Sequence, residues 1–562
     1  MVGRSYGITM PGVKLALPRF EPIVGDLQGN ACRVIELATA SAKAGADVLL
    51  LPELAICGYP PHDLLLRSGF VQACEQAIDR VASKTPEGLL VLIGSPVSLG
   101  DGRIANALIA LRDGDRIASA RKRLLPMYDV FDETRWFTTG EEACVVDHAG
   151  RTLGLLVCED LWQGGDAQVD GRWCCDPVGD VAAKGCDVMI AASASPIVIG
   201  KHQRQIDRLI EVSAAHRCPV VSLNQAGAND DLVFGGAALA VHPDGSMCPG
   251  RPPMGQSDAM LIVDLEDPTR VDRITQSDDE LRCRALIESV RCYVQRTGSG
   301  GVLVGLSGGI DSAVTAAIAA AAIGPTLVQG VSMPSMYSLG QSHDDAAALV
   351  ELVGMRPLVT LPIGDLHRSI RDTLGDAVSM RDGDITDQNL QARSRGVLLM
   401  AMSNASDSLV LATGNKSELA VGYATLYGDM CGAVAVLGDV LKTQVYSMAK
   451  WMNANHEAIG LQSPPIPLAT IARPPTAELA PNQCDQDSLP PYAVLDDIIA
   501  AVVDHDCGLE EATRRTGLDE DFVAYWMAVI DRNQFKRAQA AVIPKVARRS
   551  FGRGRRWPIV AR

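Results

Sequence analysis

Short apolar runs alternate with stretches of helical periodicity along the first half of the chain. The runs DVLLLPEL (47–54), LLVLIGSPV (89–97), LGLLVCED (153–160) and DVMIAASAS (187–195) predict buried β-strands. Because helices and strands mix in one block from Lys14 to about Leu265, we expect a layered α/β sandwich.

The pattern changes near Leu281, where strand, loop and helix begin to follow one another. VLVGL (302–306) predicts a strand, the turn SGGIDS and an alanine-rich helix follow, and TLVQGVSM (326–333) predicts the next strand. This order predicts a doubly wound parallel sheet with its ligand crevice at the carboxyl ends of the strands. The proline-rich segment 463–475 separates the sheet from a helical C-terminal tail.

A chain of 562 residues is too long for one hydrophobic core, so we expect two or three domains. The polar stretch that follows the first block is a candidate linker. We predict a first domain over residues 12–266, a linker over 267–280, and a second domain with its helical tail over 281–562.

Composition narrows the class of protein. A net charge of −16 argues against a general nucleic-acid binder, although helix N-termini and a few cations can still bind nucleotides. The 15 cysteines include no CxxC pair and no zinc-like cluster with histidine. No stretch approaches a membrane span, and the first residues lack the apolar core of a signal peptide. We expect a cytoplasmic enzyme with reduced thiols and no nucleic-acid or membrane partner.

Three residues of the first block carry possible chemistry. Glu53 and Cys158 each end an apolar run, and Lys122 lies in the segment RKRLLPMYDVFDE. Each has a plain structural explanation, since a lone cysteine is usually a core residue and a lone lysine or glutamate is usually solvated. Together with flanking words such as LPMYDVFDETRWF, they resemble the nitrilase superfamily of carbon–nitrogen hydrolases, which uses a Glu-Lys-Cys triad. The resemblance covers most of residues 14–265 and implies an α-β-β-α sandwich.

The chemistry of a glutamine amidase explains these residue types. A carboxylate such as Glu53 can take the thiol proton, and the ammonium of Lys122 favours the thiolate and stabilises the oxyanion by roughly 3 kcal/mol. The predicted intermediate is a γ-glutamyl thioester on Cys158. The resemblance also implies that Glu133 is a second carboxylate near the site, and that the glutamine is held by Tyr128, Ser195 and Lys201.

The turn SGGIDS (307–312) follows a strand and begins a helix. Gly308 and Gly309 allow the backbone to approach phosphate closely, and Ser307 and Ser312 add hydroxyl donors. The turn lacks the Lys-Ser/Thr ending of a Walker A loop, and a glycine-rich strand-to-helix turn is common without any ligand. The word SGGxDS nevertheless resembles the N-type ATP pyrophosphatases, which transfer AMP to an oxygen acceptor and release pyrophosphate.

Later words resemble the NAD synthetase family in order and spacing: QNLQARSRG (388–396), LATGNKSELAVGYATLYGDM (411–430), DVLKTQVY (439–446) and FKRAQA (535–540). The resemblance implies a Rossmann-like ATP pyrophosphatase domain. The ATP-binding residues implied are Gly305, Leu306, Ser307, Gly308, Gly309, Ile310, Asp311, Ser312, Thr413, Lys442 and Thr476. Those implied for deamido-NAD are Asn389, Glu418, Tyr423, Ala424, Thr425, Leu426 and Lys536. Asp311 and Glu418 are the candidate Mg²⁺ ligands, so Glu418 has two possible roles.

Both halves together resemble the glutamine-dependent NAD synthetases. The family resemblance implies that glutamine supplies ammonia to amidate deamido-NAD through an adenylated intermediate, with ATP as co-substrate, Mg²⁺ as cofactor and a homo-oligomeric assembly. Alternatives remain: an amidohydrolase with a regulatory second half, a non-catalytic nucleotide sensor, or a ligase with another acceptor acid. Residues 508–530 could form a DNA-binding helix-turn-helix, although their acidity favours packing helices. The basic run 545–558 is either a solvated or intersubunit face or a binding element for the anionic groups of the dinucleotide.

Overall fold

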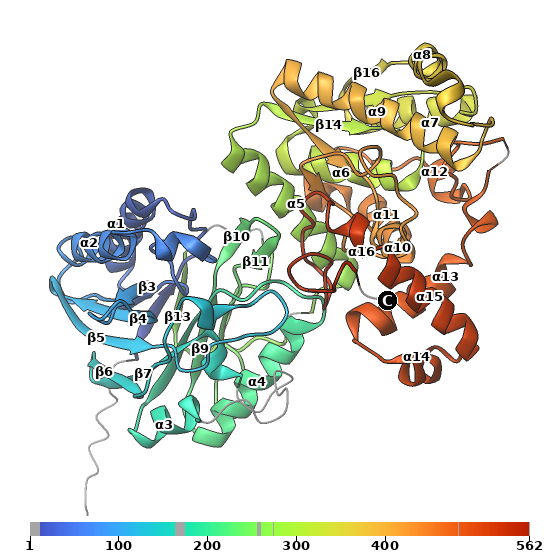
Figure 1. Cartoon of the computed structure of the whole chain (residues 1–562). Coiled ribbons are helices and arrows are strands. Elements are labelled where there is room, and N and C mark those ends of the chain that lie inside the picture. Colours follow the sequence, from blue (N-terminus) through green and yellow to red (C-terminus); the bar gives the residue numbers. More distant parts are fainter. Residues whose placement is uncertain (1–11, 163–174, 256–259, 274, 482, 561–562) are drawn as a thin grey trace, which may run out of the picture. The chain divides into compact units, whose positions relative to one another are not determined.

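The computed structural model describes residues 12–162, 175–255, 260–273, 275–481 and 483–560. The chain divides into two compact units (Figure 1). The first comprises Met1–Asn229 and Phe234–Thr275, and the second comprises Asp230–Val233 and Gln276–Arg562. Helix α5 begins at Asp278, so the last three residues of the predicted linker are helical. Ser277 caps this helix, and Asp278, Asp279 and Glu280 place negative charge at its positive end.

Two stacked sheets form the middle of the first unit. One has the order β13-β1-β2-β3-β4-β5 and the other the order β12-β9-β8-β7-β6. The strands of the first sheet are β1 (Lys14–Leu17), β2 (Val48–Leu50), β3 (Leu90–Ser98), β4 (Ile104–Arg112), β5 (Asp115–Arg121) and β13 (Leu261–Asp264). Those of the second are β6 (Cys144–His148), β7 (Arg151–Val157), β8 (Val188–Ser193), β9 (Val220–Asn224) and β12 (Ala238–Val241), and a separate hairpin joins β10 (Ala226–Asn229) to β11 (Leu232–Gly235).

Alternation of side chains along each strand produces four layers. Leu153, Leu155 and Val157 of β7 enter the core between the sheets, whereas Leu156 faces helices on the outer side. Those helices are α3 (Pro177–Ala183) and α4 (Lys201–His216), while α1 (Leu27–Lys43) and α2 (Phe70–Ala82) cover the other sheet (Figure 1). The short 3-10 helices of this unit are η1 (His62–Leu66), η2 (Glu133–Arg135) and η3 (Cys158–Leu161). The predicted α-β-β-α sandwich is confirmed.

A five-stranded parallel sheet organises the second unit, in the order β16-β15-β14-β17-β18. Its strands are β14 (Gly301–Gly305), β15 (Val328–Ser332), β16 (Arg356–Thr360), β17 (Ser408–Ala412) and β18 (Val434–Ala435). The chain winds outward from β14 to β16 and then returns to the other side of β14. The strand order therefore reverses beside β14, where a doubly wound sheet opens its ligand crevice. The predicted doubly wound sheet is confirmed.

Helices surround this sheet (Figure 1). The alanine-rich α6 is buried along most of its length because its small side chains let α5, α11 and β14 approach closely. The helices of the second unit are α5 (Asp278–Thr297), α6 (Ile310–Ile323), α7 (Gly340–Val353), α8 (Gly364–Leu374), α9 (Ile385–Ser406), α10 (Lys416–Val421), α11 (Lys442–Ala454), α12 (Leu468–Ala472), α13 (Tyr492–Ile499), α14 (Leu509–Thr516), α15 (Glu520–Arg532) and α16 (Gln534–Arg537). Short turns of helix complete the unit: η4 (Pro325–Leu327), η5 (Gly375–Ala377), η6 (His456–Ile459), η7 (Asp485–Asp487) and η8 (Ala500–Asp504).

The C-terminal helices pack into a core of their own. Val523, Trp526 and Ile530 of α15 join residues of α10 and α13 in one apolar cluster, which supports packing helices over a DNA-binding motif. In the basic run, Lys545 is buried and donates to the carbonyl oxygens of Ala547 and Arg548 at 3.0 and 2.8 Å. Arg555 is buried beside Asp531, 3.2 Å away. These two cations therefore hold the fold together.

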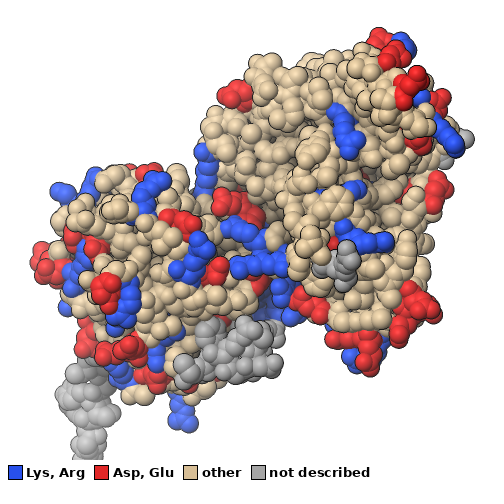
Figure 2. Space-filling view, in the orientation of Figure 1, with Lys and Arg blue, Asp and Glu red and all other residues tan. Residues whose placement is uncertain are grey.

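Charged side chains of both signs are interspersed over the visible face of the first unit, and they are sparse over much of the second (Figure 2). Among the helices that the structure describes, none combines the length and apolar character needed to cross a bilayer.

Gly94 of β3 lets the segment after β2 pack directly on the sheet. A Cβ atom at this position would lie 2.2 Å from the backbone nitrogen of Leu54 and 2.5 Å from the carbonyl oxygen of Pro52. We expect Gly94→Ala to destabilise the first unit by about 1–3 kcal/mol, because the backbone around Glu53 cannot give way cheaply. Hydrogen exchange of the β3 and β4 amides measures the loss. Gly364→Ala, where a Cβ meets no neighbour, is the control, and unchanged exchange in Gly94→Ala would contradict the prediction.

Candidate active sites

A buried lysine forms the centre of the site in the first unit. The Nζ atom of Lys122 donates to Glu53 Oε1 at 2.7 Å and to Glu133 Oε1 at 2.9 Å, and all three side chains are almost completely buried. Glu53 also accepts from Asn106 Nδ2 at 2.7 Å and from the Ala194 amide at 2.9 Å. The carboxylate of Glu53 is therefore fixed from three sides by groups that no sequence pattern connects.

Cys158 lies at the sharp turn between β7 and η3. Its φ of 45° is in the left-handed region, which directs the thiol differently from the side chains of the preceding strand. The carboxylate of Asp160 accepts from the amides of Val157, Arg123 and Leu124 at 3.1, 3.0 and 2.9 Å. Asp160 thus joins the segment that carries Cys158 to the segment that carries Lys122. The strands end earlier than predicted, β2 at Leu50 before the non-donating Pro52 and β7 at Val157.

Burial dominates the protonation of this site. It raises the pKa of the Cys158 thiol well above the ordinary value, and the nearby charge of Glu53 raises it further, while Lys122 acts in the opposite direction. Burial alone would lower the pKa of Lys122, but Glu133 and Glu53 outweigh burial and raise it well above its usual range. Burial raises the pKa of Glu133 to about 7 despite Lys122. Burial and Glu53 therefore favour the protonated thiol of Cys158, whereas Lys122 favours the thiolate as expected.

The predicted glutamine-binding residues lie around Glu159, which directly follows Cys158. Tyr128 donates its hydroxyl to Glu159 at 3.0 Å, and Lys201 donates to Ser195 Oγ at 2.6 Å. Burial raises the pKa of Glu159, whereas Lys122, Tyr128 and Lys201 all lower it, so these groups act on the same carboxylate. Glu159 was not among the predicted site residues, because neighbouring residues of a strand point to opposite faces and only the turn at η3 changes this.

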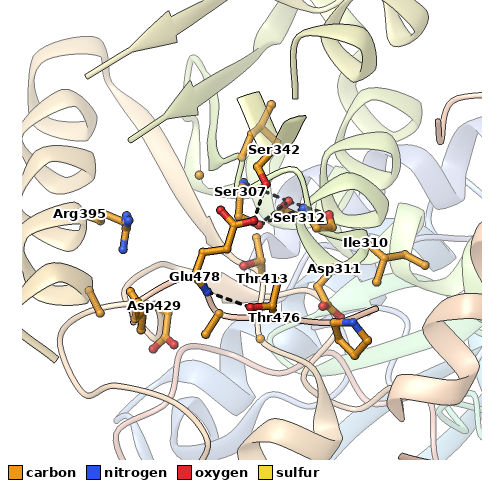
Figure 3. A pocket seen from close by; sticks show the side chains of 18 of the residues that line it. Ser307, Ile310, Asp311, Ser312, Ser342, Arg395, Thr413, Asp429, Thr476 and Glu478 are labelled. Atoms are coloured by element: carbon orange, nitrogen blue, oxygen red, sulfur yellow. Dashed lines mark hydrogen bonds between the residues drawn. The ribbon is translucent and has the colours of Figure 1, made fainter. Parts of the chain in front are cut away.

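A pocket of about 270 Å³ opens in the second unit beside the turn after β14 (Figure 3). All predicted ATP-binding residues except Gly308 line it, as do Glu418 and Tyr423 from the predicted deamido-NAD set. Gly308 lies just behind the wall with a φ of 77°, and a Cβ there would lie 2.4 Å from the carbonyl oxygen of Ser342. Helix α6 begins at Ile310, so its first amides face the pocket where an anion would be stabilised.

Two carboxylates of the pocket share one lysine. Lys442 Nζ pairs with Asp311 and lies 3.2 Å from Glu418 Oε1. Asn415 donates to Asp311 at 2.9 Å and caps α10 through the Glu418 amide at 3.0 Å. Burial raises the pKa of Glu418 to about 8, opposed by Lys442 and increased by Asp311 and Asp485. Clustered carboxylates in one pocket fit a hard divalent cation, so the donor set is suitable for Mg²⁺.

Helix α10, which carries Glu418, is anchored by a second buried lysine. Lys416 Nζ donates to Asp439 at 2.9 Å, to Asp504 at 2.6 Å and to the carbonyl oxygen of Arg549 at 2.7 Å. Asp439 in turn accepts from the amides of Val546 and Ala547 at 2.8 and 2.7 Å. The segment TGNKSE is therefore tied to the chain that follows α16 by paired charges.

The other predicted deamido-NAD residues form an adjoining group that does not line the pocket. Thr425 donates to Asn389 at 2.8 Å, and Lys536 donates to the carbonyl oxygens of Gly422 and Ala424 at 2.6 and 2.7 Å. Leu426 packs with Tyr423 and Ala424 against the C-terminal helical core. Asp429 connects this group to the pocket, because it lines the pocket and accepts from the Thr425 amide at 2.6 Å.

Buried Glu53, Lys122 and Cys158 on an α-β-β-α sandwich, followed by a glycine-rich turn on a doubly wound sheet, form the arrangement expected of amidase–ATP pyrophosphatase fusion enzymes. Residues 14–269 match the Carbon-nitrogen hydrolase family and residues 282–540 match the NAD synthase family. The chain belongs to the family of glutamine-dependent NAD(+) synthetases, whose member in Xanthomonas campestris pv. campestris is 41% identical over 98% of both chains.

Other members of this family are similar over the whole chain. The glutamine-dependent NAD(+) synthetase of Acinetobacter baylyi is 38% identical and covers 98% of this chain and 99% of its own. The structure of the Acinetobacter baumannii enzyme in complex with ADP is similar with a TM-score of 0.77 at 34% identity, over 98% of this chain and 99% of that one. The Cytophaga hutchinsonii structure shares the fold, with a TM-score of 0.82 at 20% identity over 98% of both chains.

Replacement of Lys122 tests whether its charge favours the ionised form of the buried glutamates. In Lys122→Met the two buried carboxylates lose their cation, and the pKa of Glu133, already raised to about 7 by burial, rises further above its value in the unfolded chain, about 4.3. A folded state that binds more protons loses stability as the pH rises, so the defect should reach about 3–5 kcal/mol at pH 8 and be smaller at pH 5. Calorimetric unfolding at both pH values, with the exposed Lys43→Met as control, measures the difference. A defect of equal size at both pH values would disprove this account.

Proposed function

We propose that this chain synthesises NAD from deamido-NAD, ATP and glutamine, and releases AMP, pyrophosphate and glutamate. The observation that carries the proposal is that the SGGIDS loop and Glu418 of the TGNKSE helix line one and the same pocket. The glutamine-dependent NAD(+) synthetases match this chain over nearly their full length. The amidase triad in the first unit supplies a source of nitrogen.

The first half-reaction uses the groups around Cys158. Glu53 takes the thiol proton as the sulfur attacks the side-chain amide of glutamine, so a thiolate need not form in advance. Lys122 stabilises the oxyanion of the tetrahedral intermediate. Collapse of this intermediate breaks the C–N bond, and the proton held by Glu53 goes to the leaving ammonia. Water then attacks the thioester, and glutamate departs as the thiol is restored.

The second half-reaction takes place in the pocket beside α6. The loop from Gly305 to Ser312 holds the ATP phosphates, while the nicotinate carboxylate attacks the α-phosphorus and pyrophosphate leaves. Ammonia then attacks the carbonyl of the adenylate, AMP leaves and the amide of NAD remains. The Acinetobacter baumannii structure, which is a complex with ADP, supports a nucleotide-binding role for this chain. Asp311 and Glu418 would hold Mg²⁺, which neutralises phosphate charge when bound.

Two active sites in one chain suit the properties of ammonia. Near neutral pH free ammonia is mostly ammonium, which has no lone pair with which to attack the adenylate. Transfer through a closed channel would keep the nitrogen neutral and its effective concentration high. We include such transfer in the proposal on these chemical grounds.

The proposal also includes the domain limits, the roles of the site residues, the localisation and the assembly. The predicted domain limits, 12–266 and 281–562 with a linker between them, remain a prediction, as do the roles of the individual site residues. We further propose a cytoplasmic homo-oligomer that acts only on small molecules, by analogy with the family. Two of the tail cations, Lys545 and Arg555, already have protein partners.

One assay tests the whole proposal. Incubation of the purified protein with ATP, Mg²⁺, glutamine and deamido-NAD should yield NAD, AMP and pyrophosphate in equal amounts, measured by mass spectrometry. Glutamate release without NAD or AMP would favour an amidohydrolase, and ATP binding without turnover would favour a nucleotide sensor. Either result from folded protein would refute the ligase.

A pair of variants separates the two half-reactions. Cys158→Ala should lower glutamine-dependent NAD formation by at least about a hundredfold, yet leave the rate with ammonium chloride within about twofold. Asp311→Asn should lower NAD formation by at least about tenfold with either nitrogen source, because the pocket loses a proposed Mg²⁺ ligand and the carboxylate that pairs with Lys442. Each variant is the folding control for the other. Loss of both activities in a folded Cys158→Ala protein would contradict separate sites.

A further inference from the structure

Arg395 of α9 extends into the pocket of the second unit, on the side opposite the SGGIDS loop (Figure 3). Its Nε atom donates to the carbonyl oxygen of Met333, at the end of β15, at 2.9 Å. This bond fixes the plane of the guanidinium and leaves its other nitrogens toward the pocket. Among the described residues, no carboxylate lies within ion-pair distance of Arg395.

The other cations of the pocket wall are already neutralised. Lys442 pairs with Asp311 and Glu418, and Arg473 pairs with Asp345. Arg395 differs from these two cations. The carboxylates whose charges act on it, Glu478 and Asp429, are hydrogen-bonded to other groups. Glu478 accepts from the Leu339 amide at 3.2 Å and from the Ser342 hydroxyl, and Asp429 accepts from the Thr425 amide at 2.6 Å.

A buried arginine without an ion-pair partner lowers the free energy of unfolding. Burial lowers the pKa of Arg395 to about 10, and the charges of Glu478 and Asp429 offset this only in part. The guanidinium is still protonated at neutral pH, so the fold keeps a partly desolvated positive charge without a counter-ion. Such an arrangement is retained where an incoming anion supplies the missing partner.

The position of Arg395 indicates which anions can reach it. Helix α9 also carries Asn389, six residues earlier and therefore roughly 9 Å along the helix, beside Thr425 in the predicted deamido-NAD group. The SGGIDS loop on the far side would hold the departing pyrophosphate. Asp429, whose charge acts on Arg395, accepts from the Thr425 amide and so connects Arg395 to the proposed dinucleotide group, while Arg395 itself lines the nucleotide pocket.

We propose that Arg395 is a substrate-binding residue that pairs with an oxyanion of the reacting groups during adenylation. The inference rests on the proposed function of the second unit. The flat fork of donors suits either of two oxyanions, the α-phosphate of ATP or the pyridine carboxylate of deamido-NAD. The carboxylate has two oxygens in a plane and the phosphate has a tetrahedral set of oxygens, and each group can accept two parallel hydrogen bonds.

Binding measurements on the full-length protein distinguish these sources. In Arg395→Met, calorimetric titration with ATP alone should show about tenfold weaker binding if the phosphate is the partner. Titration with deamido-NAD alone should show the same loss if the carboxylate is the partner. Arg395→Lys keeps the charge but not the fork and should recover part of the affinity. Arg368→Met, at an exposed arginine of α8 paired only with Asp365, is the matched control.

Thermal unfolding separates a binding role from a structural one. Because Arg395 lacks a counter-ion, Arg395→Met should unfold at the same or a higher temperature without ligands and lose most of the stabilisation by the affected substrate. Lower ligand-free stability with unchanged binding of both substrates would overturn the proposal. Wild-type protein that forms no NAD would instead refute the proposed function, whereas active wild-type with fully active Arg395→Met refutes this inference alone.

Discussion

Both candidate sites depend on one physical arrangement, a lysine ammonium buried between two carboxylates. Lys122 lies between Glu53 and Glu133, and Lys442 lies between Asp311 and Glu418. Charges removed from water are tolerated only when they are paired and hydrogen-bonded, so each lysine fixes the positions of its two acids. A third lysine, Lys416, uses the same arrangement between Asp439 and Asp504 to hold the helix on which Glu418 lies. The geometry of the chemistry is thus set by charge pairing inside the protein.

The two pairings have different consequences because their surroundings differ. Around Lys122 the three carboxylates of Glu53, Glu133 and Glu159 all accept hydrogen bonds from protein groups. Burial and the charge of Glu53 raise the pKa of Cys158 and so favour its protonated thiol. In the second pocket Asp311 and Glu418 are likewise paired with Lys442, but on the opposite wall Arg395 has no carboxylate within ion-pair distance among the described residues. That pocket therefore keeps one cation for which an incoming anion would supply the partner.

Much of the fold could be predicted from the sequence because its patterns are local. The runs at 89–97, 187–195 and 302–306 became β3, β8 and β14, and the turn after β14 begins α6. Strand ends were less predictable, since Pro52 and the left-handed Cys158 interrupt apolar runs that look continuous. The triad was found through words that resemble a family. Asp160, Glu159 and Arg395 could not be predicted from such patterns. Asp160 and Glu159 matter through partners distant in sequence, the amides of 123–124 and the hydroxyl of Tyr128. Arg395 matters because, among the described residues, no acid pairs with it.

The separation of two sites within one chain also follows from their opposite needs for water. In the proposed reaction the thioester on Cys158 must admit water, because hydrolysis is the step that frees the enzyme. The adenylate must be shielded from water, because hydrolysis there would waste ATP and return the acid. One pocket cannot meet both demands. Two units, each with its own lysine and its own acids, would allow these two demands of the proposed reaction to be met separately, with only neutral ammonia shared.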